Sequence, residues 1–284
     1  MNGREVCFRT DDGLRLVATA WGDPDAPAVL FQHGGGQTRH SWKGSAEALA
    51  NQGWYALSLD LRGHGDSDWD PATDYTLTRY GQDSVCVARA LGRPPVVVGA
   101  SLGGISALLG AHGAESAPFS ALVLVDVTPR MDLNGAAKIM GFMSERVLEG
   151  FANLEEAADA IATYLPHRPR PKNTDGLAKN LRQRENGRWF WHWDPAFMTG
   201  RSRPGLALRQ EDLLDAARAL SIPAMLIRGR MSELVGEEHA REFLELVPHA
   251  RFEDVSGAGH MVAGDENDAF TEAVARFLGD LDRP

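Results

Sequence analysis

Short apolar segments alternate with segments of helical periodicity along most of the chain. Several apolar segments have no polar position in alternation, which is typical of strands buried on both faces. Between them, apolar residues recur every three or four positions and predict amphipathic helices. Together these patterns predict an α/β fold with a mostly parallel sheet flanked by helices. The predicted strands are LRLVATAW, AVLFQ, YALSLDL, PVVVGA, ALVLVDV, PAMLIRG and ARFEDV, and the predicted helices span residues 42–52, 76–91, 102–112, 236–247 and 266–278.

A further strand is predicted around Val6, and only the residues TDDG separate it from the strand that begins near Leu14. A connection this short and polar joins neighbouring antiparallel strands in a hairpin. Since the other strands alternate with helices, we expect this hairpin at one edge of the sheet.

The alternation of strands and helices stops after ALVLVDVTPR and resumes near residue 222. Between these points no strand is predicted. A helical stripe covers residues 147–165, and a second helix is predicted over residues 174–185, ended by Gly187. A helical block between two strands of one sheet is typical of an inserted cap or lid, which often carries substrate contacts. The predicted division is a core of residues 1–130 and 221–284 with a helical cap of residues 131–220.

Charge and length narrow the class of protein. The 284 residues can bury a substantial core without disulfides or metals. With 29 Lys and Arg against 39 Asp and Glu, the net charge is −10. This balance disfavours a nucleic-acid partner, because phosphate contacts require clustered positive charge. The one basic stretch, His167 to Lys172, contains prolines and is interpreted as a solvated connector.

Cys7 and Cys86 match no metal or redox spacing, so we expect unpaired, buried or half-buried thiols in a reducing compartment. No window approaches the roughly 18 consecutive apolar residues that a membrane span needs. The first residues contain no basic segment followed by an apolar run, the pattern of an export signal. The expected location is the cytoplasm, with no membrane partner.

Ser101 lies between glycines at the junction of a predicted strand and a predicted helix, in VVVGASLGG. It could simply cap the helix that begins at Leu102. The sharp turn, however, projects its side chain beyond the carboxyl edge of the sheet, and Gly99 and Gly103 remove Cβ atoms that would collide there. The helix N-terminus also favours negative charge beside it. This context predicts a nucleophile, which needs a base, an orienting acid and oxyanion donors.

The segment FQHGGGQT follows a predicted strand, and its glycines expose backbone N–H groups at the same edge of the sheet. The N–H groups of Gly35 and Leu102 are the candidate oxyanion donors. A phosphate cradle is the competing interpretation, but neither a P-loop Lys nor G-x-G-x-x-G follows the strand.

The candidate base is His260, which lies in VSGAGHMVAGD between the last strand and the last helix. Its position after the nucleophile and the acid matches the chain order of one known class of triad. The remaining histidines are interpreted as structural: His40, His112, His167, His192, His239 and His249 lie in helical or connector settings, and His33 and His64 in glycine-rich turns.

Taken together, HGGG, DLRGHGDSD, GASLGG, the acidic loop after LIRG, and GAGH resemble the α/β-hydrolase superfamily over nearly the whole chain. The resemblance implies a serine-nucleophile, carboxylesterase-like enzyme with a helical cap. It also implies acyl transfer through a covalent acyl-enzyme that water hydrolyses, with Ser101 as nucleophile, Gly35 and Leu102 as oxyanion donors and His260 as base. We expect no cofactor and no metal.

The acid has two candidates. Family members usually carry it in the loop after the strand PAMLIRG, where Glu233 is the best-placed carboxylate. Some carry it after the preceding core strand, a position that Asp126 occupies. Asp126 could instead be a turn residue that binds the backbone before Pro129. We therefore expect Glu233 to be the acid and keep Asp126 as the alternative.

Two other motifs have more than one interpretation. The segment DLRGHGDSD (residues 60–68) has His and Asp neighbours that could bind a metal, but its glycines and its position after a strand favour a structural turn. The segment RWFWHWDPAF contains Trp189, Trp191 and Trp193, which either line the acyl pocket or pack the cap onto the core. Substrate binding by these tryptophans is one of our predictions.

A serine nucleophile suits esters, lactones or thioesters, whereas aspartate nucleophiles on this fold process epoxides or alkyl halides. The predicted reaction is hydrolysis of a small carboxylic ester, and the predicted partner is that small-molecule substrate. The alternatives are a C–C bond hydrolase of ring-cleavage diketones, a cofactor-free perhydrolase of the haloperoxidase kind, and a non-catalytic small-molecule receptor. The sequence gives no indication of the oligomeric state.

Overall fold

The computed structural model describes residues 2–164, 170, 174–200, 210–262 and 267–281. Its centre is an eight-stranded sheet in the order β1-β2-β4-β3-β5-β6-β9-β10. The predicted hairpin is confirmed at one edge, where β1 and β2 are antiparallel. The pairing of β2 with β4 is also antiparallel, and the other neighbours in this sheet are parallel. The strands are β1 (Arg4–Arg9), β2 (Arg15–Trp21), β3 (Ala28–Gln32), β4 (Tyr55–Leu59), β5 (Val96–Ala100), β6 (Ala121–Val125), β9 (Ala224–Gly229) and β10 (Arg251–Val255).

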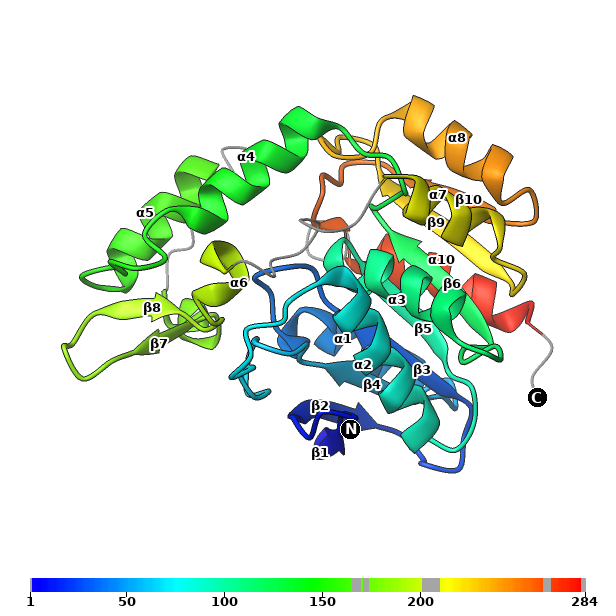
Figure 1. Ribbon diagram of the computed structural model, residues 1–284, viewed down its shortest axis with the longest axis horizontal. Coiled ribbons are helices and arrows are strands. Elements are labelled where there is room, and N and C mark those ends of the chain that lie inside the picture. The colour runs from blue at the N-terminus through cyan, green and yellow to red at the C-terminus, as the bar shows by residue number, and fades with distance from the viewer. Residues whose placement is uncertain (1, 165–169, 171–173, 201–209, 263–266, 282–284) are drawn as a thin grey trace.

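Helices cover both faces of the sheet, which explains why the central strands are apolar throughout (Figure 1). Successive side chains of a strand point to opposite faces. In β3, Val29 and Phe31 belong to one apolar core, and Leu30 belongs to the other. The core helices are α1 (Lys43–Ala50) and α10 (Asn267–Gly279) on one face, and α2 (Leu77–Ala90), α3 (Leu102–Gly113), α7 (Gln210–Arg218) and α8 (Glu237–Leu246) on the other. All of them except α7 were predicted from the sequence.

An insertion between β6 and α7 forms a lobe beside the sheet (Figure 1). We call its described part, residues 131–200, the cap segment. The segment is not purely helical, so the prediction that it lacks strands is wrong. Its elements are α4 (Leu133–Ser144), α5 (Leu154–Tyr164), η2 (Asp175–Lys179), β7 (Leu181–Gln183), β8 (Trp189–Trp191) and α6 (Ala196–Thr199).

The helix predicted over residues 174–185 is replaced by a short 3₁₀ turn and an antiparallel hairpin of β7 and β8. The aromatic run WFW favours a strand over a helix, and Gly187, at φ 77°, takes part in the turn instead of ending a helix. The stripe over residues 147–165 is helical only from Leu154 onward. Before it, Arg146 and Gly150 adopt positive φ values, which are incompatible with a continuous helix.

The end of the cap segment differs from the predicted boundary at residue 220. Helix α7 packs against α3 and α8, so it lies with the core helices. Apart from Arg170, the basic stretch of residues 167–172 lies outside the described residues. Arg170 itself forms ion pairs with Glu155 and Asp159 on α5.

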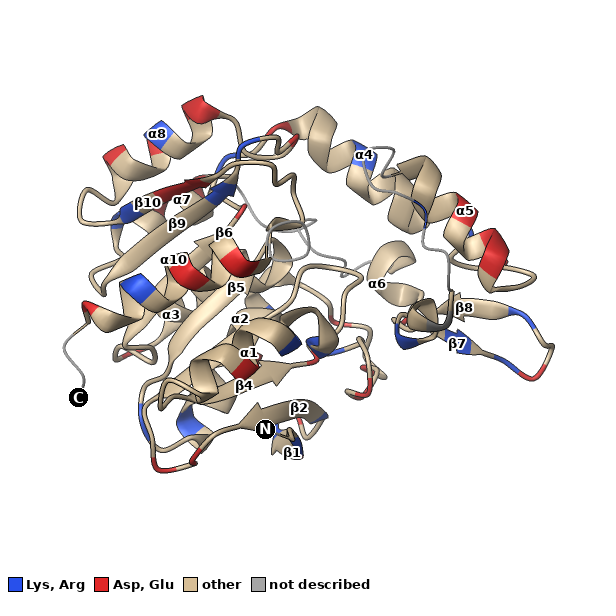
Figure 2. Cartoon of the chain, turned by 180° about the vertical axis from the view of Figure 1, so that it is seen from behind, with Lys and Arg blue, Asp and Glu red and all other residues tan. Residues whose placement is uncertain are grey.

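Charged residues of both signs lie along the outward-facing helix α8 (Figure 2). Cys86 is buried and Cys7 is exposed, so the expectation that Cys7 is at least half-buried is wrong. Cys7 belongs to β1, an edge strand whose burial pattern shows exposed residues along most of its length. None of the helices in the described part of the chain has both the length and the apolar composition needed to cross a membrane.

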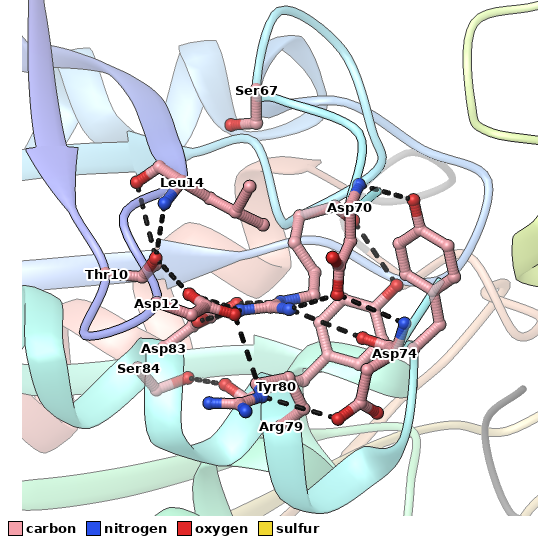
Figure 3. A network of polar contacts seen from close by, with 12 residues as sticks. Thr10, Asp12, Leu14, Ser67, Asp70, Asp74, Arg79, Tyr80, Asp83 and Ser84 are labelled. Atoms are coloured by element: carbon pink, nitrogen blue, oxygen red, sulfur yellow. Dashed lines mark hydrogen bonds and ion pairs between the residues drawn. The ribbon is translucent and has the colours of Figure 1, made fainter. Parts of the chain in front are cut away.

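A buried cluster of ions fixes the turn that follows β4. Figure 3 shows Asp12, Asp70 and Asp83 converging from different parts of the chain. Each accepts hydrogen bonds from the guanidinium of Arg62, with N–O distances of 3.1, 2.9 and 2.6 Å respectively. Because Arg62 is fully buried, these contacts balance a charge that water does not reach. The cluster joins the β1–β2 hairpin and α2 to the turn.

Removing the cation of this cluster is expected to destabilise the fold strongly. Arg62→Ala leaves the buried carboxylates of Asp70 and Asp83 without their partner, and we expect a loss of about 3–5 kcal/mol in the free energy of unfolding. Arg218→Ala is the control, because its ion pair with Asp215 is exposed and should contribute less than about 1 kcal/mol. Urea unfolding measures both, and equal losses would contradict the prediction.

Candidate active site

Ser101 occupies the sharp turn between β5 and α3 that the sequence predicts. Its backbone has φ 46° and ψ −114°, a strained conformation for a residue with a side chain. The turn is possible because the neighbouring glycines allow close approach: a Cβ atom on Gly99 would lie 2.6 Å from Cα of Gly104. One on Gly103 would lie 2.6 Å from the carbonyl oxygen of Gln32. The Ser101 side chain makes no capping hydrogen bond to α3, which disfavours the interpretation as a simple helix cap.

His260 lies in the loop after β10 and faces the carboxylate of Asp126 at the end of β6. The distance between His260 Nδ1 and Asp126 Oδ2 is 2.7 Å. A carboxylate only accepts hydrogen bonds, so Nδ1 carries the proton and Nε2 remains as the basic nitrogen of the neutral ring. Asp126 is fully buried and, like Ser101, has a positive φ, here 49°. Ser101 and Asp126 therefore follow adjacent parallel strands at the carboxyl edge of the sheet.

Glu233, the expected acid, does not lie at His260. Its carboxylate binds Nζ of Lys138 on α4 at 2.5 Å, and its side chain is 36% exposed. The preceding residue explains the difference, because Ser232 in the same loop turns toward Asp126 and leaves Glu233 facing the cap segment. The structure thus brings Asp126, and not Glu233, to the imidazole.

Two further groups hold the Asp126 carboxylate in place. Ser232 Oγ donates to Oδ2 at 2.6 Å, and the backbone N–H of Gly229 donates to Oδ1 at 3.0 Å. The N–H groups of Leu234 and Val235 donate in turn to Ser232 Oγ, which fixes the direction of its proton. No sequence signal identifies Ser232, because serine is common in loops and its partner lies 106 residues earlier.

The loop that contains Gly35 lies close to Ser101, and Leu102 follows Ser101 directly. The glycine loop, which we define as residues 33–37, follows β3, and a Cβ atom on Gly34 would lie 3.4 Å from Cβ of Ser101. Among the residues that the structure describes, neither the Gly35 N–H nor the Leu102 N–H donates a hydrogen bond to the protein. For Leu102 this follows from its place in the first turn of α3, where amides have no partner within the helix.

Buried histidines orient successive peptide groups of the glycine loop. His33 Nε2 accepts the Leu61 N–H at 3.1 Å, so Nδ1 carries the proton and donates to the Gly34 carbonyl at 2.8 Å. This carbonyl shares a peptide plane with the Gly35 N–H, which points the opposite way. His64 Nε2 accepts the Gly36 N–H at 3.1 Å and so fixes the next peptide.

Both of these imidazoles are neutral. Burial lowers the pKa of His33 to about 4 and that of His64 to about 3, since each ring is removed from water. For His64 the nearby His33 ring adds to this effect, and the Asp60 carboxylate offsets only part of it. In the His64 ring, Nδ1 carries the proton and donates to the Arg62 carbonyl at 2.9 Å. The sequence interpretation of these histidines as structural did not foresee their contact with the glycine loop.

Apolar side chains of the cap segment cover the glycine loop. A Cβ atom on Gly35 would meet Phe197 at 3.2 Å and Met143 at 3.6 Å. Trp193 lies against Gly36 in the same way, at 3.1 Å, and its ring stacks on that of Trp191 with centroids 4.8 Å apart. Both tryptophans are buried, whereas Trp189 is half-buried. These contacts fit the packing interpretation of the tryptophans, and substrate binding by Trp189, Trp191 and Trp193 stays a prediction.

The segment of residues 60–68 forms a structural turn, as favoured from the sequence. The Asp60 carboxylate accepts the backbone N–H groups of Arg39 at 2.6 Å and Asp66 at 3.0 Å, and it pairs with the Arg39 guanidinium. Because Asp60 is fully buried and bound by these donors, its oxygens serve the turn itself.

Comparison with known proteins agrees with the observed fold. The model of the alpha/beta hydrolase fold family matches residues 27–266. The chain belongs to the α/β-hydrolase family. This confirms the resemblance found in the sequence and the predicted fold class.

This α/β hydrolase is similar to several proteins over most of its length. It is 32% identical to esterase Rv0045c of Mycobacterium tuberculosis over 276 residues, which cover 93% of this chain and 86% of the relative. It is 27% identical to a 3-hydroxybutyrate-oligomer hydrolase of Cupriavidus necator, with 87% of each chain covered. A solved structure of esterase Rv0045c matches with a TM-score of 0.77 and 30% identity, covering 98% of this chain and 92% of that one.

The burial of neutral His64 predicts a dependence of stability on pH. In the unfolded chain this histidine binds a proton below its usual pKa of 6.5, whereas the folded protein resists protonation down to about 3. Lowering the pH through this window therefore favours unfolding. His64→Asn removes the effect, so its destabilisation relative to the wild type should be about 2 kcal/mol smaller at about pH 5 than at about pH 7.5.

Urea unfolding of the wild type and His64→Asn at both pH values measures this difference. The hydrogen bonds lost in the variant are the same at both, so only the proton uptake of His64 changes the comparison. A difference between the two proteins that does not change with pH would show that His64 binds a proton as readily in the folded state as in the unfolded chain.

Proposed function

We propose that this protein is a serine hydrolase that cleaves a small carboxylic ester through an acyl-enzyme. Ser101 is the nucleophile, His260 the general base and Asp126 the acid that orients it, with Gly35 and Leu102 N–H groups as oxyanion donors. The observation that carries the proposal is the 2.7 Å hydrogen bond from His260 to Asp126, beside the strained turn that presents Ser101. Asp126 thus replaces Glu233 as the proposed acid.

The reaction follows from the chemistry of these groups. His260 Nε2 accepts the Ser101 proton while Oγ attacks the ester carbonyl, and the carbonyl oxygen gains negative charge near the two amides. Asp126 stabilises the imidazolium that forms. His260 then protonates the leaving alcohol, and water attacks the acyl-enzyme by the reverse sequence of proton transfers. No cofactor is required at any step.

The names of the two relatives compared above support ester hydrolysis as the proposed reaction. One is named an esterase and another an oligomer hydrolase, and both match this chain over more than four-fifths of its length. Apolar Met143 and Phe197 lie over the proposed oxyanion donor Gly35, which suits an apolar group next to the ester carbonyl. The proposed partner is this small-molecule ester, and the proposed setting is the cytoplasm.

Labelling of the nucleophile tests the proposed chemistry. A fluorophosphonate should modify the wild type at a stoichiometry of one on Ser101, identified by peptide mass spectrometry, whereas Ser101→Ala should not be labelled. The variant should also lose ester hydrolysis by about 10⁴-fold or more, since the nucleophile is absent. A folded wild type that resists labelling and binds small molecules reversibly would indicate a receptor instead.

Paired carboxylate variants test the choice of acid. Asp126→Asn is expected to lower kcat by about 10³- to 10⁴-fold, because the amide cannot hold His260 in the required tautomer. Glu233→Gln is the matched control and should change kcat less than threefold, since Glu233 binds Lys138 at the surface. Hydrolysis of short p-nitrophenyl esters measures both. A large loss in Glu233→Gln alone would restore Glu233 as the acid.

A further inference from the structure

His192 connects the cap segment to the glycine loop by hydrogen bonds at both nitrogens of its ring. It follows β8 directly and is only 2% exposed. Its Nδ1 accepts the N–H of Gly65 at 2.7 Å, so its proton lies on Nε2. Nε2 donates to the Gly36 carbonyl at 3.2 Å. One imidazole of the cap segment thus bridges two loops of the core.

The bond to Gly36 completes a series along the glycine loop. His33 binds the carbonyl of the Gly34–Gly35 peptide, and His64 binds the N–H of the Gly35–Gly36 peptide. His192 binds the carbonyl of the peptide that follows Gly36. Three successive peptide planes are therefore each held by a different imidazole, and the last of these imidazoles belongs to the cap segment.

These hydrogen bonds restrict the backbone of Gly36 and of the preceding residue, Gly35. Gly36 has φ 76°, and a glycine with no side chain can change its backbone dihedrals at little steric cost. Hydrogen bonds on both its N–H and its carbonyl remove that freedom. Because Gly35 precedes Gly36, the direction of the Gly35 N–H depends on the same restraints.

We propose that His192 is a positioning residue that sets the oxyanion donor Gly35 according to the docking of the cap segment. The inference rests on the proposed function, since it assigns a catalytic consequence to the Gly35 amide. An amide displaced by a fraction of an ångström stabilises a developing oxyanion less well, while it affects ground-state binding little. The cap segment would then complete the catalytic site as well as enclose the substrate.

The chain offers a matched control for this proposal. Tyr75 Oη donates to Asp194 Oδ2 at 2.7 Å, which is another buried hydrogen bond between the core and the cap segment. This bond lies two residues from His192 in sequence but does not involve the glycine loop. Tyr75→Phe and His192→Phe therefore each remove polar contacts at the same boundary while keeping an aromatic ring.

Amide hydrogen exchange of Gly36, followed by NMR, tests the restraint itself. His192→Phe should speed its exchange at least about tenfold relative to Tyr75→Phe, because the loop loses a hydrogen bond on the same residue. His192→Gln keeps a donor and an acceptor on a side chain of similar reach, so it should restore part of the protection. Equal exchange in His192→Phe and Tyr75→Phe would overturn the proposal, whatever the activity of the protein.

Kinetics then test the catalytic consequence. With a p-nitrophenyl ester, His192→Phe should lower kcat by about 10- to 100-fold with KM within about threefold, and His192→Gln should recover part of the loss. Tyr75→Phe should keep kcat within about threefold even if its melting temperature falls as much. Equal kcat values for the two Phe variants would overturn the proposal.

Failure of the proposed function has a different signature. In that case the wild type itself would neither hydrolyse the ester nor react with the fluorophosphonate at Ser101. The exchange of the Gly36 amide would still decide whether His192 restrains the loop, because that measurement does not depend on catalysis. A positive exchange result with an unreactive Ser101 would overturn the catalytic part of the inference.

Discussion

A carboxylate that is removed from water must be satisfied by hydrogen-bond donors, and the Asp126 carboxylate dominates the arrangement of the candidate site. It is fully buried, and its donors come from the last residue of β9 and from the loops that follow β9 and β10. These loops follow different strands, so the sheet must bring the three strand ends together in a fixed register. The parallel pairing of β6, β9 and β10 does this. The requirements of one charge thus determine where His260 lies relative to the end of β6.

Around the Asp126 carboxylate, neutral imidazole side chains connect the loops of the site. His33, His64 and His192 each accept one backbone N–H and donate to one backbone carbonyl. Burial lowers the pKa of each ring, so none needs a buried counter-ion. The buried ionic cluster around Arg62 fixes the 60–68 turn by a different means. His33, His64 and His192 thus join loops near Ser101 without adding charge to the site.

Local patterns in the sequence predicted the core and the candidate nucleophile and base well. Runs of buried apolar residues identify parallel strands, and G-x-S-x-G after such a strand identifies Ser101 because the turn itself demands those glycines. The cap segment was harder to predict. In its short hairpin, Trp191 packs against Phe151 and Trp193 of the same segment, and the strand propensity of three residues is a weak signal on its own.

The choice of acid was not predictable from position along the chain. Glu233 and Ser232 are neighbours, and a rotation of one residue decides which of them faces Asp126. That rotation depends on contacts with α4, which begins about 100 residues earlier. The contacts of His33, His64 and His192 with backbone groups could not be predicted from the sequence for the same reason. His33 and His64 each bind one backbone group far away in sequence and His192 binds two, so no local pattern distinguishes them from ordinary buried side chains.

The left-handed backbone at Ser101 and Asp126 also restricts how this site can change during evolution. At φ values of 46° and 49°, side chains branched at Cβ suffer the greatest steric conflict. Cysteine or aspartate can replace the serine without added branching, whereas threonine cannot, although its hydroxyl offers the same chemistry. The backbone conformation therefore restricts which side chains can serve as the nucleophile by their branching at Cβ, independently of their chemical reactivity.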